Sequence, residues 1–290
     1  MRGAELRALL ARDRILVTPN VFDALSARIA ESVGFECLAI GGFQTAAHQL
    51  GGPEPLLCLE DMALALRYAS QAVAVPLMVD AGAGWGEPLH VMRTVRVLEA
   101  AGAAAIKIED QIFPKRAHYH KGIEHVIPAD EMVAKIEAAL RARRDPDTVI
   151  VARTDAFRTD GYDEAIRRCR LFAEAGADLA YVFPNTDEDA RRAPADLAGI
   201  PLVFANSEGD RRNRPILGAP ELERLGYKVA GFPLATTNAA VAAMRDVLLQ
   251  LREHGRIDVD VQERIATRRF VEDTLGLEEA YALELETVES

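Results

Sequence analysis

One pattern recurs along most of this chain: a short apolar run is followed by a longer amphipathic stretch. Strands that helices cover on both faces of a parallel sheet are continuously apolar, so these runs indicate buried parallel strands. The expected strands are Ile15–Pro19, Cys37–Gly41, Leu77–Asp80, Ala105–Glu109, Val149–Arg153, Leu179–Phe183, Pro201–Ala205 and Lys228–Phe232. The expected helices include Phe22–Ser32, Asp61–Val73, Pro88–Ala101, Ala129–Arg143, Tyr162–Ala175 and Thr236–His254.

Eight such units within about 250 residues match the α/β class and, within it, the (β/α)8 TIM barrel. A doubly wound open sheet is the alternative, but it usually has fewer strands, and no GxGxxG follows the first strand here. We therefore predict a barrel domain over residues 1–255 and a C-terminal helical extension over residues 256–290. An extra terminal helix often packs on a neighbouring subunit, which favours an oligomer.

Composition restricts the class of function. The net charge of −11 argues against a nucleic-acid partner, because binding to phosphates requires a basic surface. The three cysteines are widely spaced without a CxxC, so the sequence indicates neither a disulfide framework nor a structural zinc site. The first residues contain no apolar signal segment, and no run is long enough to cross a membrane. We expect a cytoplasmic protein without a membrane partner.

Polar or glycine residues stand at the C-terminal end of nearly every expected strand. In a barrel these ends form one face, so they share a site although they are far apart in sequence. Asp80 and Glu109 are the expected cation ligands, because neighbouring carboxylates repel each other unless a cation or a proton lies between them, and Mg²⁺ uses one or two carboxylates plus waters. Helix capping or ion pairing is the alternative, above all for Asp110 and Asp155. The full set is Asn20, Gly41, Gly42, Asp80, Glu109, Asp110, Arg153, Asp155, Asn185, Asn206, Thr236 and Thr237.

Two further strand ends point to an anionic ligand. Arg153 ends an apolar run, and its planar guanidinium matches a substrate carboxylate with two parallel hydrogen bonds. The alternative is an internal ion pair with Asp155 or Glu109. At the second strand end, Gly41-Gly42-Phe43 exposes backbone N–H groups that can hold a carboxylate or an oxyanion, or marks only a tight turn.

The segment 111–128 is long for a connection between a strand and a helix, and loops of this length tend to be functional lids. It carries positive or titratable groups: Lys115, Arg116, His118, His120 and Lys121. A lid that closes on a dianion excludes water and supplies a general acid. The alternative for the two histidines is that they are solvated loop residues.

Four segments carry a resemblance to a known family: 19–27 (PNVFDALSA), 108–116 (IEDQIFPKR), 151–156 (VARTDA) and 232–234 (FPL). From about Thr18 to Thr237 the chain resembles the isocitrate lyase/phosphoenolpyruvate mutase superfamily. The resemblance implies a Mg²⁺-dependent barrel that acts on 2-hydroxy or 2-oxo carboxylates through a metal-bound enolate, with Mn²⁺ as a substitute ion. It also implies a homotetramer in which a C-terminal helix is swapped between subunits.

The resemblance assigns roles by matching positions. Asp80 and Glu109 match metal-binding carboxylates, and Glu54 stands in for a further aspartate of the metal site. Arg153 matches the arginine that grips the substrate, Lys115 the lysine of the lid, and Asn206 a polar residue of the pocket. Gly42 and Phe43 match the backbone donors that hold the pyruvyl carboxylate.

Several positions depart from the family pattern. Related lyases have Lys-Arg-Cys-Gly-His in the lid with the cysteine as general acid, whereas this chain has Ala117. The metal motif Asp-x-Asp-x-Gly reads Asp80-Ala81-Gly82-Ala83-Gly84 and lacks its second carboxylate. Gly41 replaces a serine, and Asn185 replaces a glutamate that follows Phe-Pro. The mutase lid, with Asn and Ser after the lysine, is not matched.

These residues predict a Mg²⁺-dependent carbon–carbon lyase or decarboxylase that acts on a small 2-oxo or 2-hydroxy di-acid. Lys115, His118, His120 and Arg153 are the expected catalytic residues, and His118 is favoured as the proton donor because it is next to the position of the missing cysteine. One alternative is a mutase or hydrolase of the phosphonopyruvate type, which acts on a P–C bond. The other is a barrel that binds a ligand without catalysis.

Overall fold

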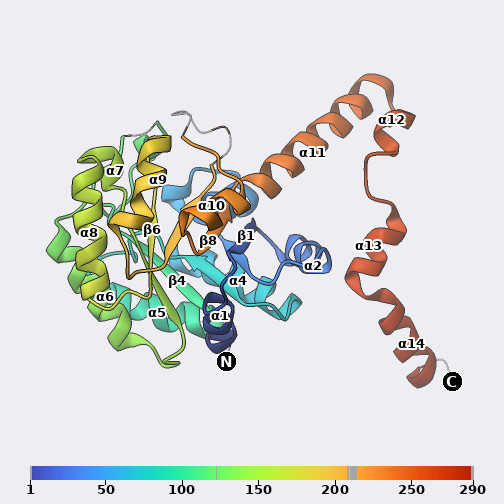
Figure 1. Ribbon diagram of the computed structural model, residues 1–290. Coiled ribbons are helices and arrows are strands. Elements are labelled where there is room, and N and C mark those ends of the chain that lie inside the picture. Colours follow the sequence, from blue (N-terminus) through green and yellow to red (C-terminus); the bar gives the residue numbers. More distant parts are fainter. Residues whose placement is uncertain (1, 122, 208, 210–213, 289–290) are drawn as a thin grey trace.

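Eight parallel strands close into a barrel in the computed structural model of the protein, which describes residues 2–121, 123–207, 209 and 214–288 (Figure 1). Each strand pairs with the next, and β8 pairs with β1 to close the sheet. The predicted α/β barrel is confirmed, and each expected strand agrees with the observed one to within two residues at either end. The strands are β1 (Leu16–Val21), β2 (Leu38–Ile40), β3 (Leu77–Asp80), β4 (Ala105–Glu109), β5 (Val149–Arg153), β6 (Leu179–Val182), β7 (Leu202–Ala205) and β8 (Val229–Phe232).

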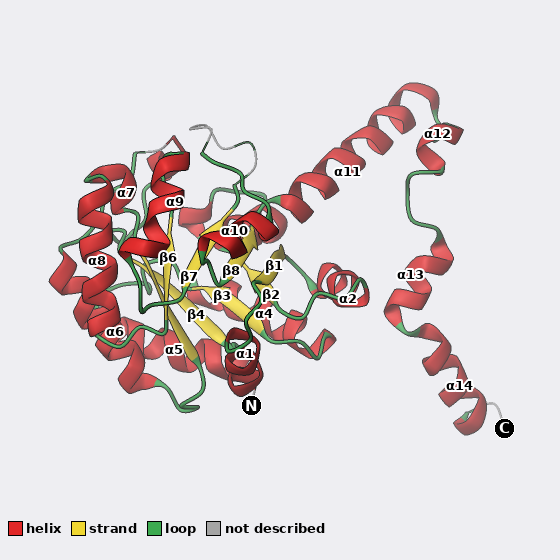
Figure 2. Cartoon of the chain, in the orientation of Figure 1, coloured by secondary structure: helices red, strands yellow, loops and turns green. Residues whose placement is uncertain are grey.

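Helices surround the sheet on its outer side (Figure 2). Those of the barrel are α1 (Arg2–Leu10), α2 (Ala24–Ser32), α3 (Gly42–Thr45), α4 (Leu59–Ala72), α5 (Pro88–Ala101), α6 (Ala129–Ala142), α7 (Ala156–Thr159), α8 (Tyr162–Glu174), α9 (Asp187–Asp196) and α10 (Ala219–Leu225). They are followed by α11 (Ala235–His254), α12 (Val259–Gln262), α13 (Arg268–Leu275) and α14 (Leu277–Thr287). Short helical turns span Ala46–Leu50, Glu54–Leu56 and Ala117–Lys121.

Both faces of the strands are buried, which explains their continuous apolar character. Outward-facing residues such as Ile106 and Ile108 pack against the helices, whereas inward-facing residues such as Val151 fill the barrel interior. Helix α1 adds Leu6 and Leu9 to this interior core. Among the barrel helices, the short α3 and α7 and the longer α1, α9 and α10 have no counterpart among the expected stretches. In α9 the reason is its composition, which is mostly charged and includes an internal proline.

The C-terminal helices extend away from the barrel. Helix α11 projects outward, and the chain then returns through α13 and α14 (Figure 1). Arg28 of α2 donates a hydrogen bond to the carbonyl of Thr274 in α13 at 3.2 Å. Helix α11 exposes apolar side chains, among them Met244 and Leu248. No helix in the described ranges is long and apolar enough to cross a membrane.

Candidate active site

The register of neighbouring strands brings the predicted site residues together. Asp80 lies opposite Lys107, Glu109 opposite Arg153, and Arg153 opposite Tyr181. Alternate residues of a strand point to the same side of the sheet, so Lys107 and Glu109 project from β4 into the same interior. Asp80, Lys107, Arg153 and Tyr181 line a cavity of about 370 Å³.

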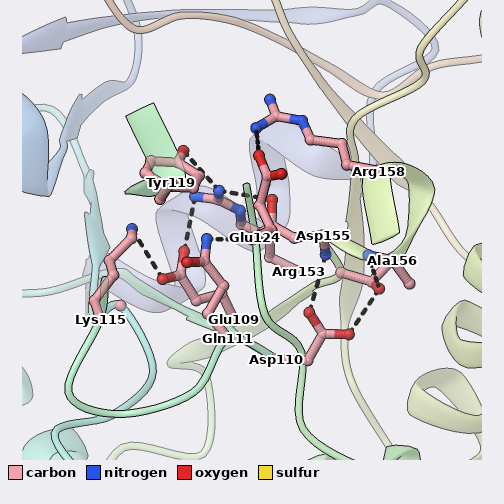
Figure 3. Close-up of polar contacts among 12 residues, drawn as sticks. Glu109, Asp110, Gln111, Lys115, Tyr119, Glu124, Arg153, Asp155, Ala156 and Arg158 are labelled. Carbon is pink, nitrogen blue, oxygen red and sulfur yellow. Dashed lines mark hydrogen bonds and ion pairs between the residues drawn. The ribbon is translucent and has the colours of Figure 1, made fainter. Parts of the chain in front are cut away.

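Arg153 is at the centre of a buried ion-pair network (Figure 3). Its Nη1 lies 2.9 Å from Oε2 of Glu109, and its Nη2 lies 2.9 Å from Oδ1 of Asp155. The same Nη2 donates to the hydroxyl of Tyr119 at 3.0 Å. Burial lowers the pKa of Arg153, but Asp155 and Glu109 outweigh that effect and hold it well above its usual value. The internal ion pair, left open from the sequence, is therefore present, and the guanidinium also reaches the cavity wall.

The lid is folded onto the mouth of the barrel. Gln111 and Val126 form an antiparallel bridge at its base. The Nζ of Lys115 lies 2.8 Å from Oε1 of Glu54 and 2.9 Å from Oε1 of Glu109. Burial lowers the pKa of Lys115, but the two carboxylates raise it further, so its ammonium stays charged. Lys115 thus connects the lid to the barrel through two ion pairs.

Lys107 is a site residue that the sequence analysis did not identify. Its Nζ lies 2.8 Å from Oδ2 of Asp80 and 4.6 Å from the ring centroid of Tyr181. Burial raises the pKa of Asp80, but the attraction of Lys107 outweighs it and brings that pKa below its usual range. The available signal was a lysine between two isoleucines in a strand buried on both faces, two residues before Glu109.

The carboxylates expected to bind a divalent ion are all close to cationic side chains. Oδ1 of Asp80 accepts from the backbone N–H of Gly82 at 2.9 Å, and its Oδ2 faces Lys107. Glu54 and Glu109 converge on Lys115. Among the residues that the structure describes, no three His, Cys, Asp or Glu side chains are grouped so as to hold a metal ion. The carboxylates of Asp80, Glu54 and Glu109 are thus already paired with ammonium groups. In this arrangement they do not fit a divalent ion bound directly to their oxygens.

The lid places Tyr119, and not His118, at the cavity. Tyr119 lines the cavity wall and contacts Arg153, whereas His118 is exposed and is not among the residues that line it. The side chain of His120 lies outside the described part of the chain. Ala117–Lys121 is a 3₁₀ turn, in which consecutive side chains point about 120° apart, so neighbours cannot share one direction.

The second strand end is positioned as predicted, since Gly41, Gly42 and Phe43 all line the cavity. A Cβ at Gly42 would lie 2.6 Å from Oε1 of Glu54, so only glycine fits there without displacing that carboxylate. The close approach of this backbone to Glu54 explains the glycine physically, independently of any role in substrate binding.

Of the three asparagines predicted at strand ends, Asn20 lines the cavity, whereas Asn185 and Asn206 hold loops and do not line it. The amide of Asn206 donates to the carbonyl of Leu217 at 3.0 Å and accepts from its N–H at 2.9 Å. Asn185 donates to the carbonyl of Phe157. Both side chains are therefore engaged with backbone groups, and the geometry gives them positioning roles.

Further cationic residues complete the wall. Arg158 and Arg214 line the cavity, and their guanidinium carbons lie 5.1 and 4.5 Å from the ring centroid of Phe183. Arg158 is also paired with Glu124 of the lid segment. A wall with guanidinium and ammonium N–H groups beside aromatic rings suits a small anionic ligand.

Comparison with known proteins gives matches over most of the chain. The model of the phosphoenolpyruvate phosphomutase family matches residues 6–252. The chain is 36% identical to 2,3-dimethylmalate lyase of Eubacterium barkeri over 285 residues, which is 97% of this chain and 96% of the relative. It is 37% identical to 2-methylisocitrate lyase of Aeropyrum pernix, covering 94% and 87%, and 36% identical to oxaloacetate decarboxylase of a Bradyrhizobium species, covering 87% and 86%.

Solved structures are similar over nearly the whole chain. Oxaloacetate acetylhydrolase in complex with 3,3-difluorooxalacetate superposes with a TM-score of 0.90 at 33% identity, covering 98% of this chain and 96% of that one. Phosphonopyruvate hydrolase in complex with oxalate and Mg²⁺ superposes with a TM-score of 0.88 at 28% identity, covering 99% of both chains. The ligands of these related proteins are small carboxylates.

Proposed function

Because the chain belongs to the phosphoenolpyruvate mutase/isocitrate lyase superfamily, which comprises carbon–carbon lyases, decarboxylases and hydrolases of small carboxylates, we propose that it is a carbon–carbon lyase or decarboxylase. Its substrate is a small 2-oxo or 2-hydroxy di-acid, and the reaction passes through an enolate. The observation that carries this proposal is the cavity at the C-terminal end of the strands, whose wall bears Lys107, Arg153, Arg158 and Arg214.

The residues of the cavity have complementary roles in this reaction. Arg153 binds the carboxylate next to the oxygenated carbon, because its guanidinium reaches the wall from a fixed position. The backbone N–H groups of Gly42 and Phe43 stabilise the enolate oxygen. Lys115 closes the lid over the substrate, since its ion pairs with Glu54 and Glu109 tie the lid to the barrel.

Decarboxylation is the branch that this lid supports best. The bond between C3 and the leaving carboxylate breaks, CO₂ departs, and the electron pair forms the enolate of the 2-oxo acid. A proton added at C3 completes the reaction. Cleavage of a 2-hydroxy acid requires in addition a base that takes the hydroxyl proton. Decarboxylation needs no such base, and water can supply the proton at C3, so this reaction tolerates Ala117 in place of the acidic cysteine.

The enolate requires a cation beside Asp80. The resemblance predicts Mg²⁺ or Mn²⁺ there, with Asp80, Glu109 and Glu54 as the carboxylates, and a bound ion would supply Lewis-acid stabilisation of the enolate. Because the donor set as arranged does not fit such an ion, the roles above rest on the side chains and backbone groups of the chain itself.

A substrate screen tests the proposal. Oxaloacetate, 2-methylisocitrate, 2,3-dimethylmalate and phosphonopyruvate are each incubated with the enzyme, with Mg²⁺ and with chelator. Released pyruvate, glyoxylate, CO₂ and phosphate are measured. We expect turnover of at least one di-acid and its loss in Arg153→Met. Turnover of phosphonopyruvate alone would assign P–C bond chemistry, and oxalate binding without any turnover would assign a non-catalytic barrel.

We also propose that the barrel domain of residues 1–255 assembles through the extension of residues 256–290. The support is the exposed apolar side chains of the extension, including Phe270, Leu283 and Leu285, which a single chain leaves in contact with water. The expected assembly is a homotetramer. Light scattering on the intact protein measures its mass, and a monomer at micromolar concentration would contradict this proposal.

A further inference from the structure

Lys107 occupies a position that packing alone does not explain. It lies in the middle of β4 between Ile106 and Ile108, which pack against the helices, and its own side chain points into the barrel. Burying an ammonium group is costly unless a carboxylate compensates it, and here Asp80 does so at 2.8 Å. The side chain of Lys107 keeps 15% of its surface exposed, so the ammonium remains accessible from the cavity.

The net charge of the Asp80–Lys107 pair equals that of the metal-bound motif in related proteins. In the motif Asp-x-Asp-x-Gly, two carboxylates and one divalent ion have a net charge of zero. In this chain Gly82 replaces the second carboxylate, and Asp80 with Lys107 again has a net charge of zero. Relative to the motif, this chain has one carboxylate fewer and one ammonium more. Its net charge there is therefore higher by two, which is the same change that a bound divalent ion makes in the motif.

An ion and this ammonium cannot both bind the same carboxylate oxygen without strong repulsion. Mg²⁺ binds oxygen at about 2.1 Å, so an ion on Oδ2 of Asp80 would lie at most about 4.9 Å from Nζ of Lys107. The other oxygen of Asp80 accepts from the N–H of Gly82 at 2.9 Å. The remaining expected ligands, Glu54 and Glu109, are held by Lys115.

We propose that the ammonium group of Lys107 takes the place of the divalent cation and stabilises the enolate oxygen directly. This inference rests on the proposed function, because it assigns a residue to the enolate of that reaction. The ammonium donates a hydrogen bond to the oxygen on which negative charge develops and remains protonated throughout, so no bond to Lys107 forms or breaks. The enzyme then turns over its di-acid without a bound metal.

The decisive measurement is metal binding, which does not depend on knowing the substrate. Enzyme stripped with chelator is titrated with Mn²⁺, and free Mn²⁺ is measured by electron paramagnetic resonance. We expect no stoichiometric binding to the wild-type protein and full binding to a double variant, Gly82→Asp with Lys107→Met. Gly82 has a φ of 48°, which aspartate tolerates, and open space around its Cβ position.

Turnover of the di-acid provides the second readout. The wild type should keep its rate in chelator, and Lys107→Met should lose roughly a hundredfold or more, as expected for one donor to an oxyanion. The double variant should regain turnover only with Mg²⁺ or Mn²⁺. Lys228→Met is the matched control, because Lys228 contacts the carbonyl of Arg12 next to the N-terminal end of β8, and its turnover should be unchanged.

Binding of one Mn²⁺ per wild-type chain, together with loss of turnover in chelator, would overturn the inference and leave the reaction class intact. Absence of turnover with every di-acid would instead refute the proposed function, and the Mn²⁺ titration would still decide whether the wild-type site takes a metal. Because that titration uses the wild-type protein, a variant that fails to fold does not prevent the test.

Discussion

Replacing Arg153 with methionine should destabilise the fold strongly. The substitution keeps a long side chain but removes the charge that compensates Glu109 and Asp155, both fully buried and both 2.9 Å from the guanidinium. Removing one partner of a buried ion pair costs about 3–5 kcal/mol, because a charge is left uncompensated. In a chain of this size that loss corresponds to a fall in Tm on the order of 10 °C.

Thermal unfolding followed by circular dichroism checks this prediction in a double-mutant cycle with Glu109→Gln. The double variant should unfold at a higher temperature than the sum of the single effects predicts, because it removes one of the two buried carboxylates that lose their guanidinium partner, and Lys115 keeps its pair with Glu54. Arg191→Met is the control: Arg191 pairs with Glu221 at 2.7 Å on the surface, where an ion pair contributes at most about 1 kcal/mol. The Arg191→Met control should lower Tm by about 2 °C or less. An Arg153→Met protein whose Tm falls by no more than the control's would refute the reasoning.

Three further predictions concern the lid, the second strand end and the response to pH. Tyr119→Phe should lower kcat more than His118→Ala, because only Tyr119 lines the cavity; steady-state kinetics would contradict this if the order were reversed. Gly42→Ala should lower kcat/KM, since its Cβ would meet Glu54 at 2.6 Å, and a crystal structure should show that carboxylate displaced. Burial, with Asp155 beside it, raises the pKa of Asp110 from 3.8 to about 6, so the free energy of unfolding should fall as the pH rises from 3.8 to about 6 and then level off. Urea titrations of Asp110→Asn should show a flatter profile in that range.

Much of the fold was predictable from local pattern. A strand such as β4 was predicted with its observed ends, because continuous apolar character reflects burial on both faces and Glu109 marks where that burial ends. The convergence of Asp80, Glu109 and Arg153 followed from the barrel, since parallel strands bring their carboxyl ends to one face. The basic lid was predicted from the length and charge of its segment, and Lys115 does lie against the barrel carboxylates.

The partner of each charged group was decided only by the tertiary structure. Sequence spacing gives the side of the sheet on which a residue lies, but an ion pair depends on which side chain stands opposite it once the barrel closes. Lys107 faces Asp80 because β3 and β4 pair in that register. Asn206 does not line the cavity because its amide is bonded to the backbone of Leu217, which lies just before α10. The pattern of buried residues depends on neighbours along the chain and can be read from the sequence. Which charged groups pair depends on distances between residues of different strands, and these distances are fixed only when the barrel closes.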